Sequence, residues 1–416
     1  MRSLSPQPRY RIYTRPTTYF TVFKEMLTGK IRNGDSCNIL ERDICSRFGI
    51  AHAMCMPQAR VGIYYAIKAM LEPGKKLIMS PYTIADVVNM VILAGARPVF
   101  ADVERKTCNI DPASIERLID KDTGAVFITH LHGLACDMGR IVDLCKRSGV
   151  PLIEDAAQAF GTKYGGRMVG TFGDAGIYSF GMYKNLTAFY GGMTVTPHDS
   201  VAKYIQNERG GHAQMDTLAY IKKATSGLMT DVATSPPLFQ AIVHRIFRFG
   251  YLHDVECINK RVETELDVGR KKQMPEHYLR RMTPMQARIL LTGLDKVERE
   301  NSIRIRYAHI YEEGLCDIPE LILPPCREDG SHIYTYYPIQ FDERKKLIRW
   351  MMQNHRDVTR QHLKNCADLS SFEDFYSDCP NARQTAEANI LLPTYPRYGE
   401  EEVRRNVNCI RTFFGK

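Results

Sequence analysis

Between residues 50 and 200, short β-rich runs alternate with amphipathic segments, and this alternation constrains the fold more than any other feature of the chain. The expected strands are Lys76–Ser80, Pro98–Asp102, Ala125–His130, Pro151–Asp155, Gly176–Phe180 and Gly192–Thr196. The expected helices are Ala59–Leu71, Ile84–Ala94, Pro112–Ile119 and Met138–Ser148. Such alternation predicts an α/β domain with a mostly parallel central sheet flanked by helices. Ligands of such sheets bind at the carboxyl ends of the strands.

Signals for helix ends support this assignment. Asp111 before Pro112 predicts an N-cap followed by the proline preferred at the first helical position, and Gly149 predicts a C-terminal stop after Ser148. Downstream, the basic amphipathic run Leu238–Tyr251 predicts a helix, more typical of a domain or subunit interface than of a membrane surface.

The remainder of the chain predicts a second, smaller domain. A long helix from Thr283 to about Tyr311 is expected to lead into an α+β region with a strand at His332–Phe341 and helices near Glu343–Asn354 and Glu400–Phe414. The predicted organisation is an N-terminal segment (1–35), a large α/β domain (36–295) and a small C-terminal α+β domain (296–416).

Composition excludes several classes of protein. The twelve cysteines are scattered without C-x-x-C spacing, which predicts free thiols and no metal site. No apolar run is long enough for a membrane span, and residues 1–14 have no apolar signal core behind them, so a cytoplasmic protein is expected. The net charge of +9 is not gathered into a basic tract, which argues against a nucleic-acid partner. It either favours anionic substrates or only aids solubility.

Three polar side chains fall where neighbouring strands should end. Asp155 closes one strand, Ser179 lies at the end of the next, and Lys184 follows in the turn beyond it. Read alone, such an aspartate is more often a helix cap and such a lysine is usually solvated. Together they match the needs of pyridoxal phosphate (PLP), whose aldehyde requires a lysine amine for an imine and whose pyridine nitrogen requires a carboxylate. Ser179 and backbone N–H groups at a helix N-terminus can bind the phosphate.

The longer motifs carry a resemblance to a known family. The runs are Glu154-Asp155-Ala156-Ala157-Gln158-Ala159-Phe160-Gly161, Gly170-Thr171-Phe172-Gly173-Asp174-Ala175-Gly176, and Ser179-Phe180 with Lys184-Asn185-Leu186. They closely resemble the DegT/StrS-type sugar aminotransferases, which have the aspartate-aminotransferase (fold type I) architecture. The resemblance implies that Lys184 forms the imine with PLP, Asp155 pairs with the ring nitrogen, Gln158 lies beside the phenolic oxygen and Ser179 binds phosphate. It also implies a homodimer and glutamate as amino donor.

The chain departs from the pattern of that family around the cofactor. Gln58-Ala59-Arg60 stands where relatives have Ser-Gly-Thr, so Ala59 and Arg60 are expected at the phosphate, unless Arg60 points at the substrate. Ile84 aligns with the aromatic residue that stacks on the ring, so Ile84 or Tyr82 must cover it. Leu279 replaces an asparagine that reaches the phosphate across the dimer interface.

In the C-terminal domain, the segment Thr359-Arg360-Gln361-His362 aligns with residues near the sugar of relatives. Arg360 and His362 are therefore candidate substrate contacts, although a structural histidine at a strand edge would explain His362 equally well.

The resemblance predicts a PLP-dependent aminotransferase that moves an amino group from glutamate to a keto-sugar. The acceptor would be a nucleotide-linked keto-hexose or a keto-sugar acid such as an 8-oxo-octulosonate, in surface polysaccharide, lipopolysaccharide or amino-sugar biosynthesis. One alternative is a PLP-dependent sugar dehydratase, but relatives with that activity replace the lysine with histidine. A non-catalytic regulator on the same fold is the other, and it would not need Lys184, Asp155, Gln158 and Ser179 together.

Overall fold

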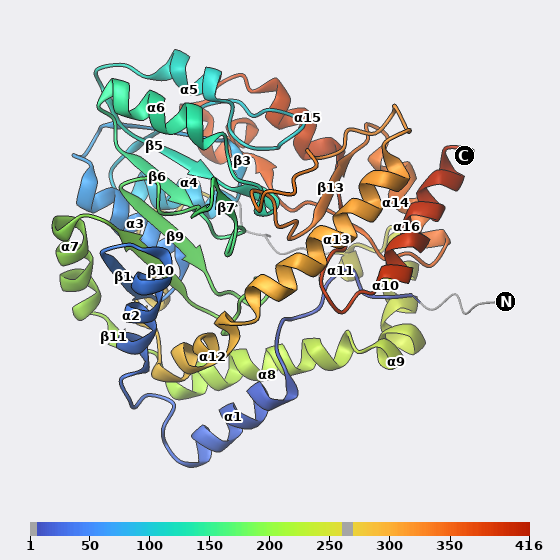
Figure 1. Cartoon of the computed structure of the whole chain (residues 1–416), viewed down its shortest axis with the longest axis horizontal. Helices are drawn as coiled ribbons and strands as arrows, with labels where there is room; N and C mark the ends of the chain where they lie inside the picture. The colour runs from blue at the N-terminus through green and yellow to red at the C-terminus, as the bar shows by residue number, and fades with distance from the viewer. Residues whose placement is uncertain (1–5, 260–268) are drawn as a thin grey trace.

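A seven-stranded sheet lies at the centre of the large domain in the computed structural model, which describes residues 6–259 and 269–416 (Figure 1). In spatial order the strands are β1 (His52–Met56), β10 (Gly192–Thr196), β9 (Ala175–Ser179), β6 (Leu152–Asp155), β5 (Thr123–Thr129), β2 (Lys76–Met79) and β4 (Arg97–Phe100). Strand β10 runs antiparallel to both of its neighbours, and the other adjacent pairs are parallel. The predicted α/β fold with a mostly parallel sheet is confirmed.

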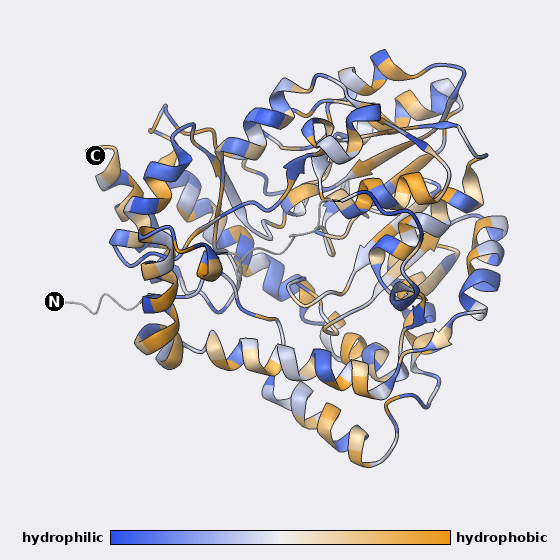
Figure 2. Ribbon diagram, turned by 180° about the vertical axis from the view of Figure 1, so that it is seen from behind, coloured by the Kyte–Doolittle hydropathy of each residue, from blue (hydrophilic) through white to orange (hydrophobic). Residues whose placement is uncertain are grey.

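Helices cover both faces of this sheet because alternate strand residues point to opposite sides. In β5, Ala125 and Phe127 pack in one hydrophobic cluster with helices α3, α4 and α7, whereas Val126 and Ile128 pack in another with α5 and α6. Figure 2 shows hydrophobic residues in the strands between these layers. The described helices up to residue 233 are α1 (Pro16–Leu27), α2 (Ser36–Phe48), α3 (Ala59–Met70), α4 (Ala85–Leu93), α5 (Pro112–Leu118), α6 (Met138–Ser148), α7 (Asp199–Gly210) and α8 (Thr217–Ala233).

The two predicted helix-end signals are present. Asp111 accepts hydrogen bonds from the N–H groups of Ala113 and Ser114 at the start of α5. Gly149 ends α6 in the left-handed conformation, with φ of 63°.

The expected single helix from Thr283 to Tyr311 is wrong. The structure contains two helices, α12 (Pro284–Leu294) and α13 (Val297–Leu315). The break at Asp295-Lys296 allows Leu294 and Val297 to pack in the same hydrophobic cluster of the large domain. The domain boundary predicted at 295/296 coincides with this break but stays a prediction.

The expected strand at His332–Phe341 is only partly present, since β13 covers Tyr337–Gln340. Tyr334 has a φ of 48°, a left-handed backbone conformation that interrupts a strand. His332 forms only an isolated bridge with Leu134 of the large domain.

The C-terminal region has its own hydrophobic cluster around a three-stranded sheet with the order β13, β16 (Asn389–Leu392), β14 (Thr359–Arg360). Helices α13, α14 (Arg344–Gln353) and α16 (Glu400–Phe413) contribute to this cluster. The N-terminal segment crosses this region, because Arg9 binds the carboxylate of Asp357 and Tyr395 donates to the carbonyl of Pro8.

The run Leu238–Tyr251 is helical, as predicted, although not uniformly so. A π-helical turn at Phe239–Val243 separates the short α9 (Pro236–Leu238) from α10 (His244–Leu252). Arg248 of α10 donates to the carbonyl of Met352 at the end of α14, so this helix packs on the small domain. No helix within the described residues is long and apolar enough to cross a membrane.

Short segments complete the described chain. They are α11 (Glu256–Asn259), α15 (Pro380–Ala388), the strand pairs β3 (Tyr82–Thr83) with β15 (Lys364–Asn365), β7 (Lys163–Tyr164) with β8 (Arg167–Met168) and β11 (Ala213–Gln214) with β12 (Arg280–Arg281), and 3₁₀ turns at Leu131–Gly133, Glu276–Tyr278, Cys366–Asp368 and Ser370–Phe375.

Candidate active site

An inner cavity of about 200 Å³ lies at the carboxyl ends of β5, β6 and β9. It brings together most of the predicted site residues: Ala59, Arg60, Ile84, Asp155, Gln158, Ser179, Lys184 and His362. Two predicted residues lie elsewhere. Arg360 lines a larger neighbouring space. Tyr82 is fully buried in the core, where its hydroxyl accepts a hydrogen bond from Asn389 at 3.2 Å, so of the two expected ring covers only Ile84 reaches the cavity.

Asp155 ends β6 and is almost completely buried. One carboxylate oxygen accepts the N–H of Ala157 at 2.9 Å. Burial raises the pKa of Asp155, while this N–H and the charge of Lys184 act in the opposite direction. A buried carboxylate with one backbone donor is under-solvated, and a cationic N–H group in the cavity would supply the missing partner.

Lys184 lies in the turn that follows β9, where its N–H donates to the carbonyl of Gly181 at 3.1 Å. Burial lowers the pKa of Lys184, the charge of Asp155 raises it, and the charge of Arg60 lowers it further. The adjacent Asn185 anchors the turn by donating to the carbonyl of Phe160 at 2.7 Å. The result is a fixed lysine whose amine is shifted toward its neutral, nucleophilic form.

The N-terminus of α3 forms another wall of the inner cavity. No side chain caps this helix, so its first N–H groups are available to an anion. Strand β10 packs so closely here that a Cβ atom on Gly192 would lie 2.5 Å from the nitrogen of Ala59. Gln58 is buried, and its side chain interacts with the Tyr190 hydroxyl. These donors, with Ser179 on the same cavity, fit a phosphate group.

Arg60 lies where the inner cavity opens into the larger space, and neighbouring side chains fix its position. Its guanidinium donates to Asp86 and, at 3.0 Å, to the hydroxyl of Tyr278, whose ring centroid lies 5.1 Å away. Lys271 also pairs with Asp86, at 2.7 Å. Arg60 therefore supplies positive charge next to both the cavity and its entrance.

Gln158 follows Asp155 on the same loop. Its side-chain oxygen accepts the N–H of His132 at 3.1 Å. This contact orients the amide so that its NH₂ group can donate toward a ligand oxygen in the cavity.

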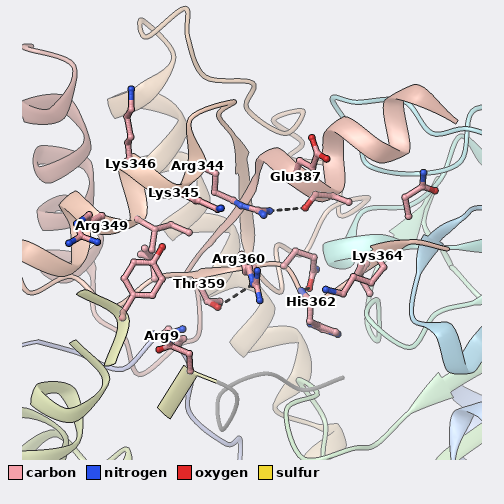
Figure 3. Close-up of a pocket in the computed structure, with 18 of the residues that line it drawn as sticks. Arg9, Arg344, Lys345, Lys346, Arg349, Thr359, Arg360, His362, Lys364 and Glu387 are labelled. Carbon is pink, nitrogen blue, oxygen red and sulfur yellow. Dashed lines mark hydrogen bonds between the residues drawn. The ribbon is translucent and has the colours of Figure 1, made fainter. Parts of the chain in front are cut away.

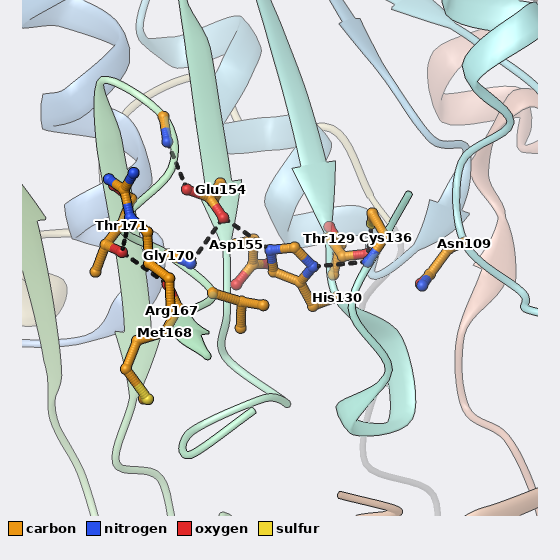
Figure 4. A network of polar contacts seen from close by, with 12 residues as sticks. Asn109, Thr129, His130, Cys136, Glu154, Asp155, Arg167, Met168, Gly170 and Thr171 are labelled. Carbon is orange, nitrogen blue, oxygen red and sulfur yellow. Dashed lines mark hydrogen bonds and ion pairs between the residues drawn. The ribbon is translucent and has the colours of Figure 1, made fainter. Parts of the chain in front are cut away.

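A buried network behind the cavity holds the ends of β5 and β6 together (Figure 4). Glu154 accepts hydrogen bonds from the N–H groups of Gly170 and Gly173, both at 2.7 Å, and contacts His130 Nε2 at 3.1 Å. Because His130 Nδ1 accepts the N–H of Cys136, Nε2 carries the proton and donates to Glu154. Neither residue was predicted as part of the site, although Glu154 belongs to a motif quoted above and His130 ends an expected strand. Their effect is to fix the strand end that carries Asp155.

An outer chamber of about 630 Å³ adjoins the inner cavity and shares Arg60, Ile84, Gln158, Ser179, Lys184 and His362 with it. His362 is exposed to this space but enclosed by protein, so desolvation and the charge of Lys184 lower its pKa to about 4. The N-terminal segment also lines the chamber. The ring of Tyr10 packs edge-on against that of Tyr183, with 4.8 Å between the ring centroids. Sequence reasoning missed this contribution, since no local signal joins the segment to the site.

The fold defines the architecture, which is that of the fold type I (aspartate-aminotransferase) class. A model of the DegT/DnrJ/EryC1/StrS aminotransferase family matches residues 18–234 and 261–411, and the chain belongs to this family. The chain is thus a PLP-dependent sugar aminotransferase.

Individual relatives agree with this assignment. The chain is 27% identical over 401 residues to the spore coat polysaccharide biosynthesis protein SpsC of Bacillus subtilis, covering 94% of this chain and 92% of that protein. Two solved structures share the fold. PseC of Helicobacter pylori, an aminotransferase involved in pseudoaminic acid biosynthesis, has a TM-score of 0.76 at 17% identity and 99% coverage of each chain. The PLP form of the sugar aminotransferase Spr1654 of Streptococcus pneumoniae has a TM-score of 0.75 at 18% identity and 98% coverage of each chain.

Proposed function

We propose that the protein transfers an amino group from glutamate to a keto-sugar, with Lys184 and Asp155 as its catalytic residues. The observation that carries this proposal is that both side chains line one buried cavity of about 200 Å³ at the ends of adjacent parallel strands. PLP, when bound, supplies an aldehyde that captures the amino group and a ring that stabilises the electron pair left on the substrate carbon.

The residues around the cavity have distinct proposed roles. Lys184 attaches the cofactor and afterwards moves the proton at the reacting carbon, for which an amine of lowered pKa is suited. Asp155 keeps a proton on the ring nitrogen. Gln158 donates to the phenolic oxygen, while Ser179, Arg60 and the N-terminus of α3, including Ala59, hold the phosphate. Ile84 covers the ring.

The acceptor is proposed to be a nucleotide-linked keto-hexose or a keto-sugar acid, with its reacting carbonyl near Lys184 and its hydroxyls in the outer chamber. His362 and Arg360 line that chamber and are proposed substrate contacts. The role of SpsC in spore coat polysaccharide biosynthesis supports a pathway of surface polysaccharide synthesis, with lipopolysaccharide as one setting.

We also propose that the protein acts as a homodimer. Support comes from an exposed apolar surface on α1 and α8, where Phe20, Leu27, Leu218 and Met229 are each more than two-thirds exposed. Light scattering on the purified protein should give twice the chain mass of 47.5 kDa; a monomer at micromolar concentration would contradict this.

The test of the function uses the two half-reactions separately. Borohydride should fix the cofactor on Lys184, as found by peptide mass spectrometry, and a Lys184→Ala variant should not be labelled. Glutamate should then convert the bound cofactor to its amine form, and one of a panel of keto-sugars should restore the original absorbance. A label on another residue would overturn the site, and failure of every keto-sugar would overturn the acceptor class.

A further inference from the structure

A second large cavity, of about 790 Å³, lies in the small domain between α10, α14, α15 and the segment Val358–Asn365 (Figure 3). We propose that this basic basin binds an anionic group, phosphate or carboxylate, carried by the sugar acceptor at a distance from its reacting carbonyl. The inference rests on the proposed function and extends it, since it assigns selection of the acceptor to a site outside the inner cavity.

The charge balance of the basin is strongly positive. Among the described residues, eight lysine and arginine side chains line it, against three acidic ones. One of the acids, Asp368, is already bound by Arg383. The other two, Asp254 and Glu387, are exposed at the rim and pair with none of the described cations.

Several of these cations have no acidic partner. Arg9 is paired with Asp357, and Lys346 with Glu343. By contrast, Arg344, Lys345 and Lys364 form no ion pair within the described parts of the chain, 6–259 and 269–416. Among the described residues, Arg344 donates only to backbone carbonyls, those of Ala386 at 2.7 Å and Asn389 at 3.4 Å, which fix its guanidinium in place without neutralising it.

Like charges are crowded together here. Burial and the neighbouring charge of Arg360 lower the pKa of Arg344 more than the charge of Glu387 raises it, and the charge of Lys364 contributes to the lowered pKa of His362. Holding cations together without an anion is unfavourable, and an anionic ligand would relieve that repulsion. Such a cluster of unneutralised positive charges is typical of an anion-binding site.

The basin adjoins the active site. Thr359, Arg360, Gln361 and His362 line both the basin and the outer chamber. These shared residues place the basin directly next to the outer chamber, and the proposal requires one bound molecule to reach from a carbonyl near Lys184 into the basin. Phe247, Tyr251 and Ile258 add an apolar side to the basin, and its volume exceeds what one small anion fills.

The test measures binding of inorganic pyrophosphate by calorimetry to the PLP-loaded enzyme, in which the cofactor's own phosphate site is occupied. The variant is Lys345→Gln/Lys364→Gln, which removes two charges while leaving the backbone contacts of Arg344 in place. The matched control is Lys146→Gln/Lys203→Gln, which removes the same charge from exposed positions on α6 and α7. A nucleoside diphosphate and a free octulosonate are measured in parallel to distinguish phosphate from carboxylate as the natural group.

Removal of two positive charges that lie about 5 Å from the bound anion should weaken pyrophosphate binding about tenfold. The affinity of the control variant for pyrophosphate should stay within about twofold of the parent. The rate of the half-reaction with glutamate should likewise stay within about twofold in both variants. Equal affinity of the basin variant and the parent, or an equal loss in the control, would overturn the anion site. If the basin variant loses affinity but no keto-sugar is aminated, the anion site stands and the proposed function is overturned.

Discussion

Glu154 provides the sharpest test of how the site is held together. Its carboxylate is fully buried and accepts three hydrogen bonds, from Gly170, Gly173 and His130. Glu154→Gln keeps the shape of the side chain but replaces one accepting oxygen with a donating NH₂ group. The best orientation of the amide keeps its oxygen toward Gly170 and His130. Its NH₂ group then faces the N–H of Gly173, which in the parent donates to a Glu154 oxygen at 2.7 Å.

The cost of Glu154→Gln follows from these contacts. One buried N–H loses its acceptor, which costs about 1 to 3 kcal/mol, and two bonds to a charged oxygen become neutral ones at about 1 kcal/mol each. We therefore expect a loss of about 3 to 5 kcal/mol in the free energy of unfolding. For a chain of this length that corresponds to about 3 to 6 °C in the melting temperature.

The assay is thermal unfolding of the cofactor-saturated protein, followed by calorimetry at fixed scan rate. Glu116→Gln is the control, because Glu116 is exposed and lies 3.9 Å from Arg147 in a surface ion pair. It should shift the unfolding free energy by less than about 0.5 kcal/mol. Equal melting temperatures for Glu154→Gln and Glu116→Gln would refute the claim that the Glu154 network fixes the strand ends.

Three further outcomes are expected. Asp155→Asn should retain the fold and bind cofactor yet lower kcat about a hundredfold to a thousandfold, and near-normal turnover would mean that the ring nitrogen has another partner. Tyr82→Phe should leave cofactor affinity within about twofold, measured by absorbance titration, while costing about 1 kcal/mol in stability through the lost bond from Asn389; a large loss of affinity would return Tyr82 to the site. Burial lowers the pKa of His132 to about 3 from 6.5, so this residue's contribution to stability falls by about 2 kcal/mol between pH 7 and pH 5, because the unfolded chain takes up the proton first. His132→Asn should flatten the pH dependence of unfolding in that range, and an unchanged slope would contradict the assignment.

The sequence predicted those helices and strands whose bounds are set by signals in the nearby residues. Helix α6 and strand β10 occupy the residues expected from their periodicity and glycine boundaries. Asp155 and Lys184 could be placed together because parallel neighbouring strands end at the same edge of a sheet, which is a rule of topology and not of distance along the chain.

Other features depended on tertiary contacts that no local pattern encodes. Arg9 meets Asp357 across 348 positions of sequence, and this pairing helps bring the N-terminal segment to the outer chamber. Tyr82 looked suitable for covering the cofactor, but an apolar core and Asn389 take its side chain away from the cavity. The left-handed backbone of Tyr334, which shortens β13, could not be expected of a bulky residue.

The electrostatics of the cavity explain why Lys184 and Asp155 can both be buried there without forming a direct ion pair with each other. Burial disfavours the charged form of each, which raises the pKa of Asp155 and lowers that of Lys184. In the proposed function, PLP would bring the two charges that this arrangement lacks: a ring N–H cation for Asp155, and a phosphate anion for the positive corner around Arg60 and the N-terminus of α3. The proposed covalent attachment at Lys184 needs the neutral amine that burial and Arg60 already favour. The side chains whose charged forms are disfavoured by burial are therefore those that we propose select this cofactor.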